Sequence, residues 1–258
     1  MKKELLLYGF ALLVACSAQS CSSSSSEPET PVVAEQEPED SSRILVFSKT
    51  SGYYHESIPD GIAAIQKLGR EHNVMVDTTK NAAYFNPDSL QNYKAVVFLS
   101  TTMDVLDTVQ QAAFEKYIQA GGGFAGIHAA ADTEYDWPWY NKLVGAYFLS
   151  HPKQQNATVR VKDKNHPSTS HLPDDWELFD ELYNYKDINP EVNVLATLDE
   201  STYEGGENGE NHPIVWYHDY DGGRAFYTGL GHTKESYSDS LFLPHIWGGI
   251  TYAMGEKE

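Results

Sequence analysis

The first half of the chain alternates between short apolar runs and stretches in which apolar residues recur at helical spacing. The apolar runs predict β-strands at residues 43–49, 74–79, 95–101 and 124–128. Helical spacing predicts helices at residues 59–72 and 107–120, and a triple glycine ends the second of them. Ser57 and Asp60 are spaced for a capping box at the start of the first helix. Apolar strands separated by helices are typical of a parallel sheet covered on both faces, so this half predicts an α/β fold.

The second half has a less regular pattern. Helical spacing predicts helices at residues 137–148 and 241–254, and residues 164–191 are predicted as a long loop. Alternating or apolar runs predict strands at residues 157–163, 192–199, 213–220 and 223–230. The last two flank Asp221-Gly222, which is a hairpin signal. We therefore expect an antiparallel hairpin added to the parallel sheet.

The N-terminus has the pattern of an export signal. Two lysines near the start precede an apolar run at residues 5–14, which is too short to cross a bilayer as a helix. The run leads into "LVAC", which has the form of a bacterial lipobox. The sequence therefore predicts a signal peptide over residues 1–15, lipidation of Cys16, and a cell-envelope protein anchored at the periplasmic or outer-membrane face. The alternative is ordinary cleavage nearer Cys21, which would give a soluble secreted protein.

Composition separates this leader from a domain at residues 43–258. Residues 16–42 are rich in Ser, Glu and Pro and predict a flexible tether. Both cysteines lie before the domain, so the domain has no disulfide, thiolate metal site or cysteine nucleophile. The formal charge is −19, of which −14 falls on the domain, and this argues against nucleic acid or anionic lipid as a partner. Membrane contact is therefore expected through the lipid anchor only, and the acidity itself is explained by the solubility of an exported domain.

Histidines recur where the predicted strands end. His55, His128 and His232 each follow a predicted strand, and ligands of open α/β sheets bind at the carboxyl ends of the strands. Carboxylates accompany them, namely Glu56, Asp132, Glu134 and Glu235. His128 lies among small residues at a sharp strand-to-helix turn, where imidazole can act as an acid, a base or a metal ligand. The alternative is a histidine packed in the sheet and bonded to backbone. The H-x-x-x-H spacing of a helical zinc site is missing from the sequence, so a metal site would have to combine His55, His128 and His232 from separate loops.

Aromatic residues are plentiful near these loops. Tyr54 and Trp137 are two of them, and flat rings beside carboxylates suit a sugar, whose C–H faces stack while its hydroxyls form hydrogen bonds. The alternative is that the rings of residues 137–148 are ordinary core side chains of an amphipathic helix.

Six long motifs resemble the ThuA family, named for trehalose utilisation. In chain order they are "GYYHESIPDGIAAI", "GGGFAGIHAAADT", "WPWYNKLVGAYFLSHP", "FDELYNY", "HPIVWYHDYDGGRAFYTGLGHTKESY" and "FLPHIWGGITYA". The resemblance implies a class I glutamine amidotransferase-like fold, with a flavodoxin-like parallel sheet flanked by helices. It also implies a role in disaccharide breakdown, with a functional link to sugar 3-dehydrogenases that make 3-keto sugars. The family motifs include His55, Glu56, His128, Asp132, Thr133, His151, Glu181, His232, Thr233 and Glu235.

The residue at the strand-to-helix turn excludes one activity of the wider superfamily. A glutaminase needs a cysteine there to form its thioester, and this sequence has His128 instead. We therefore expect no glutaminase activity.

These observations lead to two hypotheses. The first is a hydrolase, lyase or isomerase acting on a keto-glycoside, with His128 as base or metal ligand. In it, His55 and His232 would polarise a carbonyl or bind a divalent metal, and Asp132 or Glu56 would orient an imidazole. Expected substrate contacts are Tyr54, Thr133, Trp137, His151, Glu181, Thr233 and Glu235. The second hypothesis is a non-catalytic carbohydrate-binding surface lipoprotein that uses the same cleft only for capture.

Overall fold

A nine-stranded sheet forms the centre of the protein, and its first half is parallel. The computed structural model describes residues 42–256, so the predicted signal peptide, Cys16 and the tether up to residue 41 lie outside the described residues. The parallel strands are β1 (Arg43–Phe47), β2 (Met75–Thr79), β3 (Ala95–Leu99), β4 (Gly123–Ile127) and β11 (Gly223–Thr228). They lie in the order β2-β1-β3-β4-β11, which is the flavodoxin-like order and confirms the predicted fold class.

Antiparallel strands extend this sheet further than the predicted hairpin. After β11 come β10 (Pro213–Tyr220), β9 (Asn193–Leu198), β6 (Gln155–Val161) and the edge strand β7 (Asp175–Asp180). A separate two-stranded sheet joins β5 (Tyr147–Ser150) to β8 (Asn184–Lys186). The prediction of a loop at residues 164–191 was therefore wrong, because that region contains β7 and β8. Strand β7 carries charged or aromatic residues on its outer positions and β8 has three residues, so neither produces a clear apolar run.

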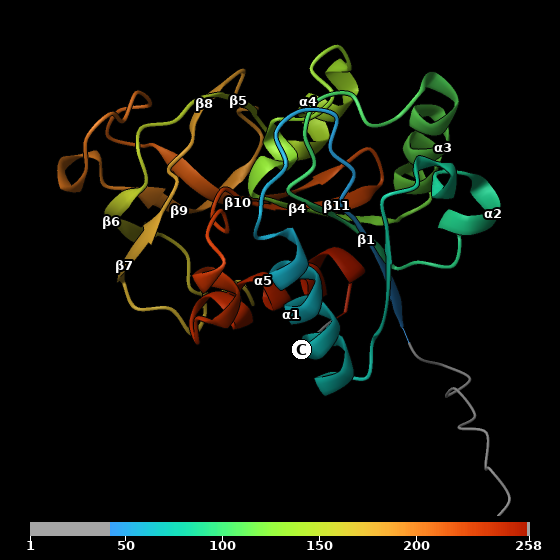
Figure 1. Ribbon diagram of the computed structural model, residues 1–258, viewed down its shortest axis with the longest axis horizontal. Helices are drawn as coiled ribbons and strands as arrows, with labels where there is room; N and C mark the ends of the chain where they lie inside the picture. Colours follow the sequence, from blue (N-terminus) through green and yellow to red (C-terminus); the bar gives the residue numbers. More distant parts are fainter. Residues whose placement is uncertain (1–41, 257–258) are drawn as a thin grey trace, which may run out of the picture. The chain divides into compact units, whose positions relative to one another are not determined.

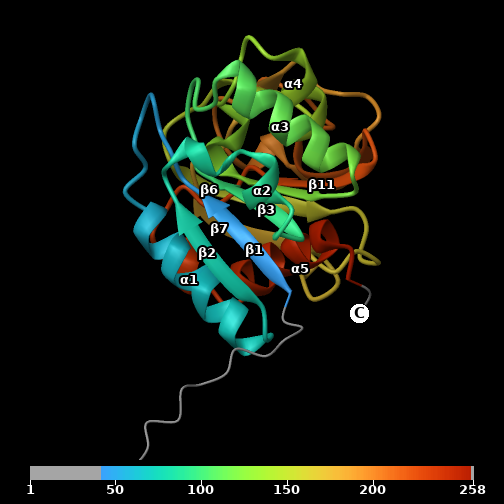
Figure 2. The ribbon, with the colours of Figure 1, turned by 90° about the vertical axis from the view of Figure 1, so that its right-hand side faces the viewer.

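Helices cover both faces of the sheet, as Figures 1 and 2 show. Helices α1 (Ile58–Glu71) and α5 (Phe242–Met254) lie on one face. Helices α3 (Thr108–Gln119) and α4 (Pro138–Val144) lie on the other, with the short α2 (Pro87–Leu90) beside α3. The 3₁₀ turns are η1 (Ala82–Tyr84), η2 (His128–Ala131), η3 (Glu200–Thr202) and η4 (Glu235–Ser238). Within the described residues, no helix combines the length and apolar character that crossing a membrane requires.

Helix α4 is shorter than the predicted helix at residues 137–148. It ends at Val144 because Gly145 takes a left-handed conformation with φ of 95°. A Cβ atom at Gly145 would lie 2.2 Å from Nε1 of Trp216, so only glycine fits against this buried ring. The chain then turns into β5 and the loop that carries His151.

The predicted capping box at Ser57 and Asp60 was also wrong. Ser57 makes no side-chain capping bond, and its hydroxyl lies 3.5 Å from the carbonyl oxygen of Gly231. A capping box is present instead at α3, where Asp107 and Gln110 bond reciprocally to backbone N–H groups. Ser57 thus connects the start of α1 to the turn after β11, where the candidate site lies.

Candidate functional site

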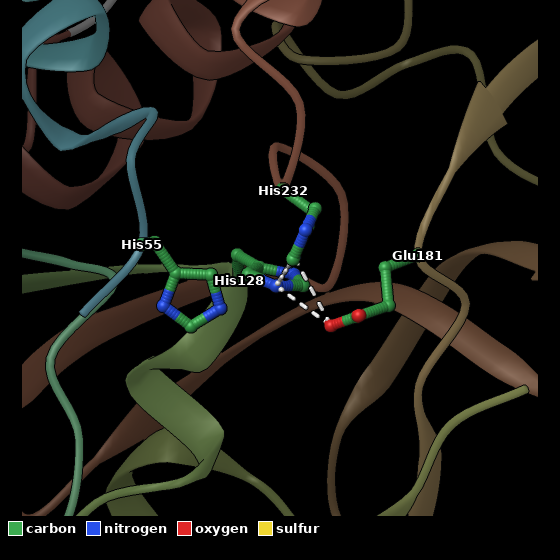
Figure 3. A group of neighbouring side chains, drawn as sticks. All are labelled: His55, His128, Glu181 and His232. Atoms are coloured by element: carbon green, nitrogen blue, oxygen red, sulfur yellow. Dashed lines mark hydrogen bonds and ion pairs between the residues drawn. The ribbon is translucent and has the colours of Figure 1, made fainter. Parts of the chain in front are cut away.

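Three histidines and one glutamate converge at the carboxyl ends of the parallel strands. His55 follows β1, His128 follows β4 and His232 follows β11, while Glu181 follows the antiparallel strand β7. One ligand atom from each of the four lies within 4.8 Å of all the others (Figure 3). His55, His128 and Glu181 are buried, and His232 is half-buried. The structure thus brings together the three histidines that sequence analysis named as metal ligands and adds Glu181 to them.

His128 owes its direction to a strained backbone. Its φ of 52° lies in the left-handed region, which costs a non-glycine residue about 1–3 kcal/mol. Its Nδ1 lies 2.9 Å from the carbonyl oxygen of Gly229, which can only accept, so Nδ1 carries the proton. The lone pair of Nε2 is then directed at the other members of the group. Metal-binding histidines commonly donate their second N–H to a backbone carbonyl in this way.

Glu181 supplies the negative charge of the group. Its Oε2 lies 3.1 Å from Nδ1 of His232 and 3.5 Å from Nε2 of His128. Burial alone raises the pKa of Glu181, but its contacts with His128 and His232 outweigh burial and lower that pKa. Glu181 is therefore ionised at neutral pH. Its second oxygen lies 3.2 Å from Nδ1 of His151, which is largely exposed.

His55 contributes a neutral imidazole. Burial, together with the neighbouring charges of His128 and His232, lowers the pKa of His55 to about 2. Its Nδ1 is buried without a hydrogen-bond partner among the described residues. Figure 3 shows the other ring nitrogen, Nε2, on the side of the group, so Nε2 is the atom through which this neutral imidazole could bind a metal ion.

His232 is held in a tautomer that a metal would change. Its Nε2 lies 2.7 Å from Nε2 of Gln154, whose amide N–H can only donate, so the proton of His232 is on Nδ1. That proton points at Glu181 and at Nε2 of His128, which lies 3.1 Å away. Binding a cation at Nδ1 therefore requires this proton to move to Nε2, where Gln154 would have to turn its amide oxygen toward the ring.

Asp180 holds the backbone next to two members of the group, and sequence analysis did not identify it. Its buried carboxylate accepts hydrogen bonds from the backbone N–H groups of Gly231 at 2.7 Å, His232 at 3.1 Å and Glu181 at 2.9 Å. It therefore fixes both the turn that carries His232 and the start of the segment that carries Glu181. Burial raises the pKa of Asp180, against the neighbouring charge of His128 and these backbone hydrogen bonds. The sequence signal was its place beside Glu181 in "FDELYNY".

A cavity of about 630 Å³ opens beside His232. This volume falls within the range of small-molecule sites. Its lining comes from four separate segments of the chain and includes Tyr53, Glu56, Gln154, Phe179, Thr233 and Glu235. Besides His232, three predicted site residues, Glu56, Thr233 and Glu235, therefore border the cavity, and Glu56 also forms an ion pair with Lys234 at 3.1 Å.

Other predicted site residues have different surroundings. Asp132 accepts a hydrogen bond from Tyr135 at 2.5 Å and does not bond to any histidine in the group. Burial raises the pKa of Asp132, against the hydrogen bond from Tyr135. Thr133 is buried, with its hydroxyl 2.9 Å from that of Thr101.

The two predicted aromatic contacts do not border this cavity. Trp137 is buried beneath α4 and donates to Glu115, which agrees with the alternative that this helix uses its rings as core. Tyr54 is exposed beside Lys80, outside the cavity lining.

The comparisons with known proteins agree with the fold. The model of the ThuA family, described as trehalose utilisation, matches residues 43–253. A ThuA-like protein from Bacteroides uniformis is 23% identical, with a TM-score of 0.71 over 82% of this chain and 91% of that one. A ThuA-like protein from Parabacteroides merdae is 22% identical, with a TM-score of 0.69 over 84% and 91%.

More distant structures share only the sheet architecture. The β-galactosidase from Bacillus circulans sp. alkalophilus is 11% identical, with a TM-score of 0.55 over 84% of this chain and 31% of that one. A comparison with curated proteins found no match. Since the family model spans nearly all of the residues that form the fold and the histidine group, the chain belongs to the ThuA family, described as trehalose utilisation.

Proposed function

We propose that this protein is a metal-dependent enzyme of carbohydrate breakdown that acts on a keto-glycoside. Family membership supports the carbohydrate-related role. The observation that carries the chemistry is the group of His55, His128, His232 and Glu181, whose four ligand atoms all lie within 4.8 Å of one another. Three imidazoles and one carboxylate are a ligand set that suits zinc and other divalent first-row metals.

A bound divalent ion would supply a Lewis acid for the oxygen atoms of a sugar carbonyl. The chain itself supplies a proton acceptor in His151. Nδ1 of His151 lies 2.9 Å from the carbonyl oxygen of Pro152, so it carries the proton and leaves Nε2 able to accept another. The contact between Nδ1 and Glu181 ties His151 to the group while its ring remains exposed.

A keto group at carbon 3 of a sugar acidifies the C–H bond at carbon 2. In the elimination we propose, Nε2 of His151 takes that proton and a double bond forms between carbons 1 and 2. The bond from carbon 1 to the glycosidic oxygen breaks, and the leaving oxygen takes up the proton that His151 removed, so the imidazole returns to its starting state. General acid–base assistance of this kind contributes about 10²–10⁴-fold to a rate. The substrate would come from a dehydrogenase that oxidises the sugar hydroxyl at carbon 3.

Metal content and turnover test the proposal together. We expect about one zinc or manganese ion per purified chain by elemental analysis, and turnover of a 3-keto-disaccharide that a chelator abolishes. Glu181→Gln keeps the size of the side chain but removes its charge, so it should reduce metal content strongly. His171→Ala is the control, because His171 is exposed and its hydrogen bond within the described residues is to the carbonyl of Leu241.

The outcomes separate the two hypotheses of sequence analysis. A chain that binds no metal in titrations with zinc or manganese, and whose activity a chelator leaves unchanged, contradicts the metal centre. Sugar binding without turnover of any keto-glycoside favours a non-catalytic carbohydrate-binding protein.

The cellular location is a separate proposal that the sequence alone supports. We propose that Cys16 is lipidated and anchors the protein at the periplasmic or outer-membrane face. Fatty-acid labelling should mark the full chain and not Cys16→Ser, whereas equal labelling of both would contradict this.

A further inference from the structure

Two exposed aromatic rings border the cavity beside the histidine group. The side chain of Tyr53 is 63% exposed and that of Phe179 is 51% exposed, which is unusual for large apolar groups. Both line the cavity of about 630 Å³. Each precedes a member of the histidine group by two positions, since Tyr53 comes before His55 and Phe179 before Glu181.

Strand geometry explains why Phe179 is exposed. Along β7 the side chains of Trp176 and Asp180 are buried, whereas Glu177 and Phe179 point outward. Alternate residues of a strand share a face, so Phe179 lies on the face opposite to the buried Asp180, and it lines the same cavity as His232. The ring therefore lies next to the proposed metal site and not in the core.

Tyr53 occupies a similar position on the other side. Its ring centre lies 4.8 Å from that of His55, with the two planes at 83°. The ring of Tyr53 thus lies perpendicular to that of one member of the group, and Tyr53 also lines the cavity. The two aromatic rings come from the loop after β1 and the end of β7, so they border the same hollow from different elements.

The polar lining of the cavity indicates the charge of its ligand. Glu56 and Glu235 outnumber the single cation Lys234, and Lys234 is already paired with Glu56 at 3.1 Å. A phosphate group would meet net negative charge here. Hydroxyl groups, in contrast, find both acceptors and donors in Glu235, Thr233 and Gln154.

We propose that this cavity binds the second ring of a neutral glycoside, the ring that leaves when the glycosidic bond breaks. Phe179 and Tyr53 pack against the C–H faces of that ring, and the polar lining bonds to its hydroxyls. This inference rests on the proposed function, because it takes the histidine group as the place where the first ring reacts. It adds that the substrate is an uncharged disaccharide or a longer glycoside and not a sugar phosphate.

Turnover by the full chain of two substrates tests the subsite. One is a 3-keto-disaccharide and the other is the methyl glycoside of the same 3-keto sugar, which has no second ring. Phe179→Ala should lower kcat/KM for the disaccharide about 3- to 12-fold, mainly through KM, and leave the methyl glycoside within about 2-fold. Tyr53→Ala should act in the same direction. Leu149→Ala is the control, because Leu149 is an exposed apolar residue of β5 outside the cavity.

Binding measurements separate failure of this inference from failure of the proposed function. Calorimetry with an unreactive disaccharide should detect weaker binding to Phe179→Ala than to wild type, with metal content unchanged, and should detect no preference for the disaccharide phosphate. If the wild type binds metal and turns over both substrates, but Phe179→Ala affects both equally or neither, the subsite is refuted and the metal enzyme stands. Tighter binding of the disaccharide phosphate would also refute it. A wild type with neither metal nor turnover refutes the proposed function itself.

Discussion

Asp180 offers a sharp test of how the site is held together. The change Asp180→Asn keeps the shape of the side chain but replaces one carboxylate oxygen by an NH₂ group. The native carboxylate uses both of its oxygens to accept hydrogen bonds from the N–H groups of Gly231, His232 and Glu181. The asparagine amide has one oxygen, so it cannot accept at both positions. At least one buried backbone N–H loses its partner and faces another donor.

The size of the effect follows from these contacts. A buried hydrogen bond to a charged group contributes about 1.5–3 kcal/mol, and an unsatisfied buried donor costs about 1–3 kcal/mol. Burial raises the pKa of Asp180, so the neutral amide avoids part of the cost of a buried charge. We expect a net loss of about 1–3 kcal/mol in the free energy of unfolding, which a domain of ordinary stability survives. Because both Glu181 and the His232 turn lose their anchor, we expect metal affinity to fall about 10- to 100-fold.

A matched variant separates positioning from general destabilisation. Glu134 is likewise buried, and it accepts hydrogen bonds from the N–H groups of Val105 and Leu106 at 2.8 Å each, away from the histidine group. Glu134→Ala removes the shared acceptor of these two N–H groups, so it should reduce stability by at least a similar amount while leaving metal affinity within about 2-fold. Chemical unfolding gives the stability and calorimetric titration with zinc gives the affinity. If Asp180→Asn loses stability but binds zinc like the wild type, the positioning argument is wrong.

Other predictions follow from the same contacts. Binding of zinc at Nδ1 of His232 should move the proton of that imidazole to Nε2; nitrogen NMR of the ring with and without zinc measures the tautomer, and a proton already on Nε2 in the metal-free protein would contradict the assignment. At 100 times its Kd, zinc should stabilise the fold by about 2.7 kcal/mol in chemical unfolding, and equal stability with chelator would argue against a native-state site. In the folded, metal-free protein the pKa of His55 is lowered to about 2. In the unfolded chain the same imidazole binds a proton when the pH falls below about 6.5, well before it does so in the folded protein. As pH falls further, this residue should therefore lower the free energy of unfolding by about 1.4 kcal/mol per pH unit. His55→Asn should reduce the slope of the free energy of unfolding against pH by that amount. Gly145→Ala should destabilise the fold by at least about 1–3 kcal/mol, because φ is positive and the added Cβ would meet the ring of Trp216; an unchanged melting temperature would contradict this.

Local patterns in the sequence predicted the parallel half of the fold well. The strands before His55 and His128 are uninterrupted apolar runs, and the glycines and alanines around His128 indicate a sharp turn. Each of these signals lies within a few neighbouring residues, so one sequence is enough to identify them.

Long-range contacts could not be predicted in the same way. Asp180 and Glu181 depend on β7, which pairs with β6 and joins the sheet at its far edge. The outer positions of β7 carry Glu177 and Phe179, so its pattern resembles a loop. Ser57 shows the same limit, because its spacing suggested a local cap while its hydroxyl faces Gly231, far along the chain.

The origin of the four ligands has a consequence for how the protein matures. His55 comes from the first strand connection, whereas His232 follows the last strand, and Glu181 depends on the antiparallel edge. The four ligands therefore come together when both the parallel and the antiparallel parts of the sheet have formed, so an ion held by all four binds after that step. Uptake of such an ion would then report a late stage of folding.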